Sequence, residues 1–297
     1  MKTTMGQKIF NVLNVIVISL LCVLMVYPFL NQLAISFNQS LDTSLGGITI
    51  YPRKFTLSNF ETVLQNSQIR VGAFISVTRV IIGTILALLI TFSAAFALSS
   101  QTLKGRTAFN WFLSLPMYIS AGTIPTYILY RYLGLMNNYL VYILPGAFSF
   151  YNMLIIRSYL ETLPASIEEA AKIDGANDIY IMFRVILPMS LPVVATVALW
   201  VSVGYWNDWM TTLYYVTKPQ LYTLQYVMMQ IIKQTEAVQQ MVSGAMNNPD
   251  ASRNLARPTP ESVQAATLIV STVPILVVYP FLQKYFISGV TLGAVKE

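Results

Sequence analysis

Long apolar runs constrain the fold of this chain more than any other feature of its sequence. From Ile9 to Ala34 no residue is charged, and five more apolar runs follow, at about residues 72–99, 108–130, 139–156, 185–210 and 263–287. A bilayer core about 30 Å thick takes about 20 apolar helical residues to cross. Only 10% of the residues are charged, whereas a soluble domain has about 25%. We therefore expect an all-α, polytopic membrane protein with six transmembrane helices.

The positions of the basic residues predict the orientation, because Lys and Arg gather in short cytoplasmic loops. Lys2 and Lys8 precede the first run, Lys104 and Arg106 follow the second, and the loop between the third and fourth runs holds only Arg131. With six spans, both termini are then cytoplasmic. The predicted regions are a helix with an extracytoplasmic segment (1–71), a core (72–290) with a second extracytoplasmic segment (211–262), and a cytoplasmic tail (291–297).

Composition also excludes several classes of function. The net charge of +6 comes from scattered bases, which is typical of membrane ends and does not indicate nucleic-acid binding. Histidine is absent, which removes the usual zinc ligand and general base. The lone Cys22 lies in the first apolar run, so no disulfide framework is possible. We predict no catalytic residue, metal site or cofactor in this chain.

Charge is concentrated in one stretch, "EEAAKIDGANDIYIMFRVILP", residues 168–188. Ser166 is expected to cap a short helix, with Glu169 completing a capping box. Gly175 follows where a left-handed turn ends a helix, and Asn177 or Asp178 can cap the helix that leads into the fifth apolar run. The sequence therefore predicts a short cytoplasmic helix and its turn at 165–176.

Two surfaces can receive this short helix, namely lipid headgroups or a socket on another protein. Its acids are repelled by anionic lipids and its apolar face is small, whereas Ala170 and Ala171 allow close approach of a protein surface. The residues alone favour the protein and leave the lipid open. The candidate contact residues are Glu168, Glu169, Ala170, Ala171, Asp174 and Gly175.

The same stretch carries a family resemblance. Glu169-Ala170-Ala171, three residues, Gly175, nine residues and then Val185-Ile186-Leu187-Pro188 resemble the EAA signature of ABC importer permeases, with Val185 where the family has Ile. "YPRKFTLSNFETVL" and the tail "GVTLGAVKE" are similar to the carbohydrate branch related to maltose permeases. "KPQLYTLQYVMMQIIKQ" resembles its oligosaccharide-type members. The resemblance covers nearly the whole chain.

This resemblance implies a type I ABC importer permease fold, a bacterial plasma (inner) membrane location and a carbohydrate, in particular an oligosaccharide, as substrate. It implies that the 165–176 helix couples the chain to a separate ATPase dimer, which binds ATP and Mg. It further implies a second homologous permease and an extracytoplasmic solute-binding protein as partners. No G-x4-GK[ST] phosphate loop occurs in the sequence, so we expect no ATP hydrolysis by this chain alone.

Candidate residues for a substrate pathway lie in the second and fifth runs. Sugars stack on aromatic rings and hydrogen-bond to amide, carboxylate or guanidinium groups, and polar groups at membrane depth mark such routes. An aromatic belt at the outer membrane interface explains the rings equally well. The candidates are Arg79, Tyr205, Trp206, Asn207, Asp208 and Trp209.

Two other functions remain open on the residues alone. An ion-coupled secondary transporter of a small polar solute needs a coupling acid in its spans, for which Asp208 is the obvious candidate. A non-transporting membrane scaffold would use the charged loop only to bind a cytoplasmic partner.

Overall fold

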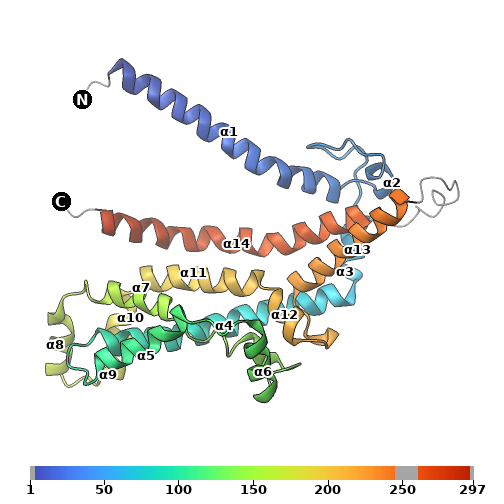
Figure 1. Ribbon diagram of the computed structural model, residues 1–297. Helices are drawn as coiled ribbons and strands as arrows, with labels where there is room; N and C mark the ends of the chain where they lie inside the picture. The colour runs from blue at the N-terminus through green and yellow to red at the C-terminus, as the bar shows by residue number, and fades with distance from the viewer. Residues whose placement is uncertain (1–3, 245–259, 295–297) are drawn as a thin grey trace. The chain divides into compact units, whose positions relative to one another are not determined.

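The computed structural model of this chain describes residues 4–244 and 260–294, which are mostly helical (Figure 1). Within these residues, two helices are long and apolar enough to cross a membrane, or up to four if each of two bent helix pairs forms one span. The all-α prediction is confirmed for this part of the chain, and the number of six spans stays a prediction. The chain divides into two compact units, which comprise residues up to Arg70 with Met228–Val273, and Val71–Val227 with residues from Pro274.

The first two predicted spans are continuous helices. α1 (Met5–Ser36) begins at a capping box in which Thr4 accepts from the Gln7 backbone N–H and the Gln7 side chain accepts from Thr4 N–H. Its apolar side chains are exposed along most of its length, as suits a helix that faces lipid or another membrane subunit. α4 (Ser67–Ser99) is the second span.

The predicted third span is two helices. α5 (Arg106–Tyr118) and α6 (Thr123–Tyr132) meet at residues 119–122 and differ in direction by 116°. Gly122 has a φ of +83°, which glycine adopts without the steric cost that a Cβ brings. The expectation of one helix over 108–130 is therefore wrong, because apolar content alone does not locate a turn.

The predicted fourth span is also interrupted. Over 139–156 only η1, a 3₁₀ turn at Tyr139–Tyr142, and the beginning of α7 (Phe150–Leu160) are helical. Pro145 and Gly146, both poor helix residues, lie between them. Irregular backbone at membrane depth is tolerated only where protein covers it or where it lines a water-filled cavity.

The predicted fifth span, 185–210, begins later than expected. α9 (Asp178–Tyr180), the π-helical η2 (Ile181–Ile186) and α10 (Leu187–Met189) precede an 85° bend into α11 (Leu191–Asn207). Pro188 and Pro192 flank this bend. A proline ring clashes with the carbonyl four residues earlier, which favours a break in the helix. The remaining elements are α12 (Met210–Tyr215), η3 (Pro219–Leu221), α13 (Leu224–Gly244) and α14 (Pro260–Ala294).

α14 changes the expected C-terminus. It contains the predicted sixth span and continues through residues 291–294, which were expected to form a separate tail. Residues 295–297 of that tail lie outside the described part of the chain.

A buried polar network organises the segment after α1, which contains α2 (Ser40–Thr43) and α3 (Ser58–Gln65). Asn59 donates to the carbonyls of Ser36 and Asn38 and accepts from the Ser40 hydroxyl. Asn38 in turn donates to Asp42, and Arg53 Nε donates to the same carboxylate at 2.8 Å. Buried polar groups of this kind hold a loop in one conformation because every unpaired group would lose its hydration without a replacement.

Acid is expected to loosen this segment. The hydrogen bond from Asn38, together with Arg53, lowers the pKa of Asp42 below its usual 3.8. A lowered folded-state pKa stabilises the fold above the unfolded value and loses that contribution as the pH falls through the folded value. The protection of the amides of residues 38–59 against hydrogen exchange, relative to their intrinsic exchange rates, should therefore fall below about pH 4. In Asp42→Asn this acid dependence should be weaker, and an unchanged profile would contradict the assignment to Asp42.

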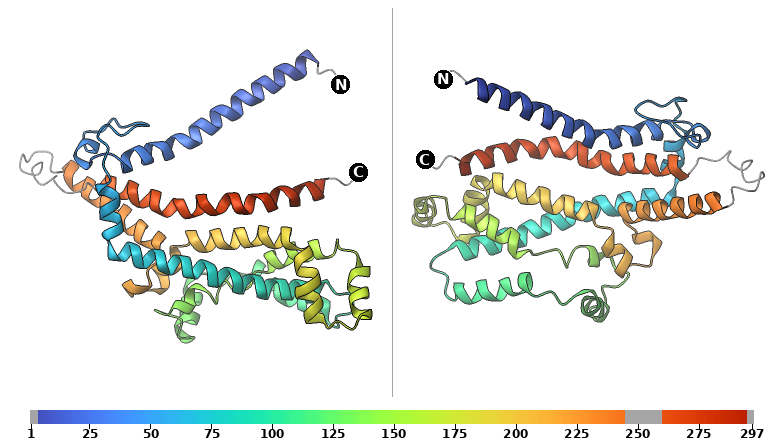
Figure 2. Two further views of the ribbon diagram at one scale, coloured as in Figure 1. Left: turned by 180° about the vertical axis from the view of Figure 1, so that it is seen from behind. Right: turned by 45° about the horizontal axis from the view of Figure 1, so that its top comes forward.

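The second unit packs around a core near its α8 end. The C-terminal half of α4 meets α7, η2 and α11 there, and α7 contacts both α5 and α11 (Figure 2). Its buried residues are Phe92, Ala95, Leu98, Met153, Ile156, Leu160, Ile181, Met182, Ile186, Val193 and Val197. A second cluster includes Ile75, Val141, Tyr142 and Tyr215. The short helix α8 lies across one end of these helices (Figure 1), where the first core holds its connections in place.

Candidate functional site

The charged stretch folds as α8 (Ala165–Ile173). The predicted cap at Ser166 is wrong, because α8 begins at Ala165 and Pro164, two residues before Ser166, holds the N-cap position without a side-chain cap. Within the helix, Lys172 Nζ donates to Glu168 at 2.6 Å, and this hydrogen bond raises the pKa of Lys172. The i,i+4 pair supports the helix.

Gly175 ends α8 as predicted. Its φ is +81°, and its N–H donates to the carbonyl of Lys172 while the N–H of Ala176 donates to that of Ala171, each at 3.0 Å. These two bonds form a Schellman turn. Asn177 then caps the next helix by accepting from the N–H of Tyr180 at 2.8 Å. The hydrogen bonds made by Gly175, Ala176 and Asn177 thus fix the angle between α8 and the helix that enters the core.

The surface of α8 combines small, acidic and apolar groups. Glu169, Ala170, Asp174 and Gly175 are exposed, whereas Glu168 and Ala171 are half-buried. Ala171 packs on the first core cluster. Beside them, Ile173 is 86% exposed and Ile179 is 69% exposed. Exposed apolar side chains on and after a charged helix suit a contact with another protein.

One carboxylate joins α5 to the end of α7, just before α8 begins. Glu161 Oε1, at the end of α7, accepts from Arg106 at the start of α5 (2.8 Å) and from Arg157 within α7 (2.9 Å). Arg157 also donates to Asn110 of α5 at 3.0 Å. The sequence analysis missed this cluster. The i,i+4 spacing of Arg157 and Glu161 indicates one half of it, but no local signal indicates Arg106.

Three of the predicted pathway residues line one cavity of about 300 Å³ in the second unit. Arg79 of α4 is ion-paired with Asp208, which follows α11, and its Nη1 donates to the Asp208 carbonyl at 3.1 Å. The guanidinium carbon lies 4.9 Å from the ring centroid of Tyr142 and 5.7 Å from that of Tyr205. Cation–π contacts of this geometry stabilise a desolvated cation. The other lining residues are Val141, Pro145, Gly146, Val201, Gly204 and Thr211.

The interrupted fourth span shapes this cavity. Pro145 and Gly146 belong to its non-helical stretch and line the wall. A Cβ on Gly146 would lie 2.5 Å from Tyr205 Oη, and one on Gly83 of α4 would lie 2.8 Å from the Tyr205 ring. Tyr205 therefore occupies a slot that exists because both positions are glycine. The sequence analysis missed Tyr142, Gly83 and Gly146, for which a lone sequence gives no signal.

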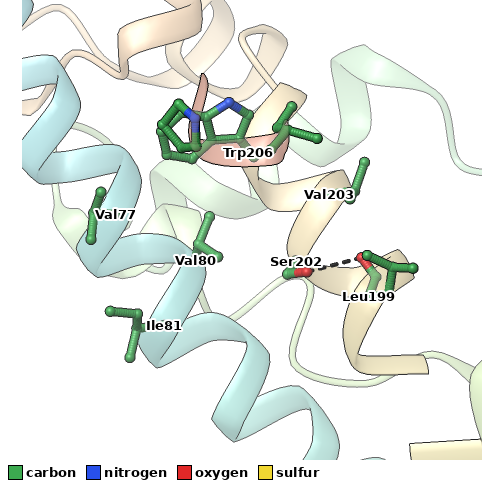
Figure 3. A pocket seen from close by; sticks show the side chains of 9 residues that line it. Val77, Val80, Ile81, Leu199, Ser202, Val203 and Trp206 are labelled. Carbon is green, nitrogen blue, oxygen red and sulfur yellow. Dashed lines mark hydrogen bonds between the residues drawn. The ribbon is translucent and has the colours of Figure 1, made fainter. Parts of the chain in front are cut away.

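The other three pathway candidates lie elsewhere. Trp206 lines a separate apolar cavity of about 250 Å³, where α4 residues face α11 residues (Figure 3). Asn207 is exposed and Trp209 half-buried, and neither is among the residues that line the Arg79 cavity. Successive helical residues point about 100° apart, so Tyr205 and Trp206 cannot share one wall.

Trp206 is expected to act through packing. Its side chain is 7% exposed, so Trp206→Ala should lower stability by about 3–5 kcal/mol and reduce the midpoint of thermal unfolding in detergent. Trp200→Ala is the control on the same helix, because Trp200 is 42% exposed. An unchanged unfolding midpoint combined with lost uptake would return Trp206 to the pathway.

Comparisons with known proteins bear on what these sites do. The model of the family "binding-protein-dependent transport system inner membrane component" matches residues 105–292. YtcP of Bacillus subtilis (strain 168), a polygalacturonan/rhamnogalacturonan transport system permease protein, is 33% identical over 98% of this chain and 100% of its own length. AraQ of Halalkalibacterium halodurans, an arabinooligosaccharides transport system permease protein, is 28% identical over 91% of each chain.

A solved structure gives the same result for the fold. A chain of a bacterial ABC transporter involved in the import of the acidic polysaccharide alginate matches with a TM-score of 0.85 and 26% identity, over 96% of this chain and 99% of that chain. The match to YtcP and this structural match each cover nearly the whole chain. On this evidence the chain belongs to the family of binding-protein-dependent transport system inner membrane components.

Proposed function

We propose that this chain is a permease subunit of an ABC importer that moves an oligosaccharide into the cytoplasm by alternating access. The main support for this proposal is α8, a short exposed helix whose fixed glycine turn leads directly into the first core cluster. Family membership supports this assignment. The permease itself binds no ATP in this proposal, and ATP with Mg belongs to the partner ATPase.

The proposal assigns α8 to a socket on an ATPase dimer. Its exposed face offers Glu169 and Ala170 with the apolar Ile173 beside them. Such a face lets a backbone approach closely and places charge at the rim, as in other protein interfaces. The Glu161 cluster supports transmission, since hydrogen bonds to a single carboxylate join α5 to the end of α7, just before α8 begins.

The remaining partners and the orientation are part of the same proposal. A second, homologous permease would complete the pathway, and an extracytoplasmic solute-binding protein would deliver the sugar. The proposal keeps six spans, as the apolar runs predict, in a bacterial plasma membrane, and the distribution of Lys and Arg supports cytoplasmic termini. The Arg79 cavity is proposed as one wall of the substrate pathway.

Reconstituted vesicles test the function. Uptake of a labelled oligosaccharide should require ATP, the ATPase and the binding protein, and no uptake is expected when any one is missing. Uptake driven by an ion gradient alone would support the secondary transporter instead. Asp208, the coupling acid that a secondary transporter would need, is already paired with Arg79, which argues against that alternative. ATPase docking without any uptake would support a scaffold.

A further inference from the structure

The Arg79 cavity contains two charges, and they are unequally accessible. Among its lining residues only Arg79 and Asp208 are charged. The Arg79 side chain is 2% exposed, whereas that of Asp208 is 29% exposed. A molecule that enters the cavity therefore reaches the carboxylate of the pair first and the guanidinium only when that carboxylate moves.

Besides its bonds to the carboxylate and the backbone carbonyl of Asp208, Arg79 is held by two aromatic rings. The rings of Tyr142 and Tyr205 both lie within 6 Å of its guanidinium carbon, and Tyr205 is itself confined between Gly83 and Gly146. The pair also leaves Arg79 incompletely satisfied, because its Nε is buried and has no hydrogen-bond partner. A buried donor without a partner raises the free energy of the state in which it occurs.

Asp208, by contrast, has a second partner. Its Oδ1 accepts from the N–H of Thr211 at 3.1 Å, while Oδ2 accepts from Arg79. If the bond to Arg79 opened, the carboxylate would keep the bond to Thr211 and its contact with solvent. The Asp208 carboxylate can therefore leave the guanidinium and keep one hydrogen bond, while Arg79 stays buried beside the Asp208 carbonyl.

We infer that Arg79 is a selectivity residue for acidic sugars, whose carboxylate takes the place of Asp208 on the guanidinium. The inference rests on the proposed function and names the substrate class of the same cavity. A planar guanidinium binds a carboxylate through parallel charge-assisted hydrogen bonds, and a neutral hydroxyl displaces Asp208 less well. A volume of about 300 Å³ lies at the small end of ligand pockets, which span about 300–1,000 Å³, so we expect one sugar unit at a time.

The test uses two probes, trigalacturonate and its methyl ester, in which a small methyl group replaces the charge of each carboxylate. The complete importer is reconstituted with its ATPase and binding protein, and KM and the maximal rate of uptake are measured for both probes. Arg79→Gln should weaken uptake of the acid about tenfold or more and leave the ester within about twofold, because it removes one charged hydrogen-bonding group. Asp208→Asn should lower the KM for the acid alone, since the competing carboxylate is gone. Arg131→Gln is the control, because Arg131 is exposed and does not line the cavity.

The outcomes separate the inference from the proposed function. Parallel loss of acid and ester uptake in both variants means that the ion pair is structural and overturns the inference. Wild-type transport of the ester but not the acid also overturns it, while the importer function stands. If Arg79→Gln does not assemble, the acid-to-ester KM ratio of Asp208→Asn decides, and an unchanged ratio overturns the inference. Uptake of every tested carbohydrate without ATP would instead contradict the proposed function itself.

Discussion

Gly175→Val should reduce ATP-driven uptake roughly tenfold or more while the protein still inserts in the membrane. Gly175 has a φ of +81° and no atom lies within 4 Å of a Cβ built on it. The substitution therefore introduces backbone strain without a clash. Left-handed backbone costs an ordinary residue about 1–2 kcal/mol, and a β-branched side chain costs more. Relief of that strain would open the Schellman turn and free α8 from its fixed angle.

Two matched variants test whether the loss of uptake comes from backbone strain in general or from strain at the α8 turn. Gly175→Asn should retain most uptake, because asparagine tolerates left-handed backbone. Gly134→Val introduces the same kind of strain at a φ of +69°, also in open space, but after α6 and outside the α8 turn. Uptake and stimulated ATPase activity are measured for all three proteins. Normal, coupled uptake by Gly175→Val would refute the rigid connection.

Gly146→Ala should displace Tyr205 and lower uptake strongly. The new Cβ would lie 2.5 Å from Tyr205 Oη and 3.1 Å from its Cζ. Overpacking of this kind costs about 1–3 kcal/mol when the neighbour cannot move away. The Tyr205 ring also lies against Gly83, so it cannot retreat in that direction unless α4 moves. The ring must therefore tilt into the cavity beside Arg79.

Rescue makes this prediction specific. Tyr205→Phe removes the closest atom, so the double variant Gly146→Ala with Tyr205→Phe should recover much of the lost uptake. Gly204→Ala is the control, because Gly204 lines the same cavity but a Cβ there meets no atom within 4 Å. Equal losses in Gly146→Ala and Gly204→Ala, or no rescue by Tyr205→Phe, would show that the slot is not what Gly146 provides.

Local features of the site were predictable from the sequence. The left-handed Gly175 and the cap at Asn177 are confirmed, since both depend on the chemistry of a few adjacent residues. Ser166 shows the limit of this reasoning: its spacing to Glu169 fits a capping box, but the helix includes it. The Pro164 backbone already supplies the extended conformation that precedes a helix, so the N-cap lies two residues earlier than predicted.

The interruptions of the spans were not predictable in the same way. Prolines in the apolar runs indicate bends, namely Pro116, Pro125 and Pro145. Pro116 nevertheless lies inside α5 without ending it. Whether a proline kinks, ends or merely begins a helix depends on which neighbours satisfy the freed carbonyls. That choice is made by packing between helices.

The sequence by itself determined that this chain is a helical membrane protein with a charged, glycine-ended helix, because hydrophobic length and backbone preference are properties of contiguous residues. Only the tertiary structure decided that Arg79 meets Asp208, 129 positions away, and that Tyr205 faces this pair while the adjacent Trp206 packs in another cavity. The physical reason is that a charge in an apolar surrounding is stable only beside its partner, and the partner is selected by how the helices pack.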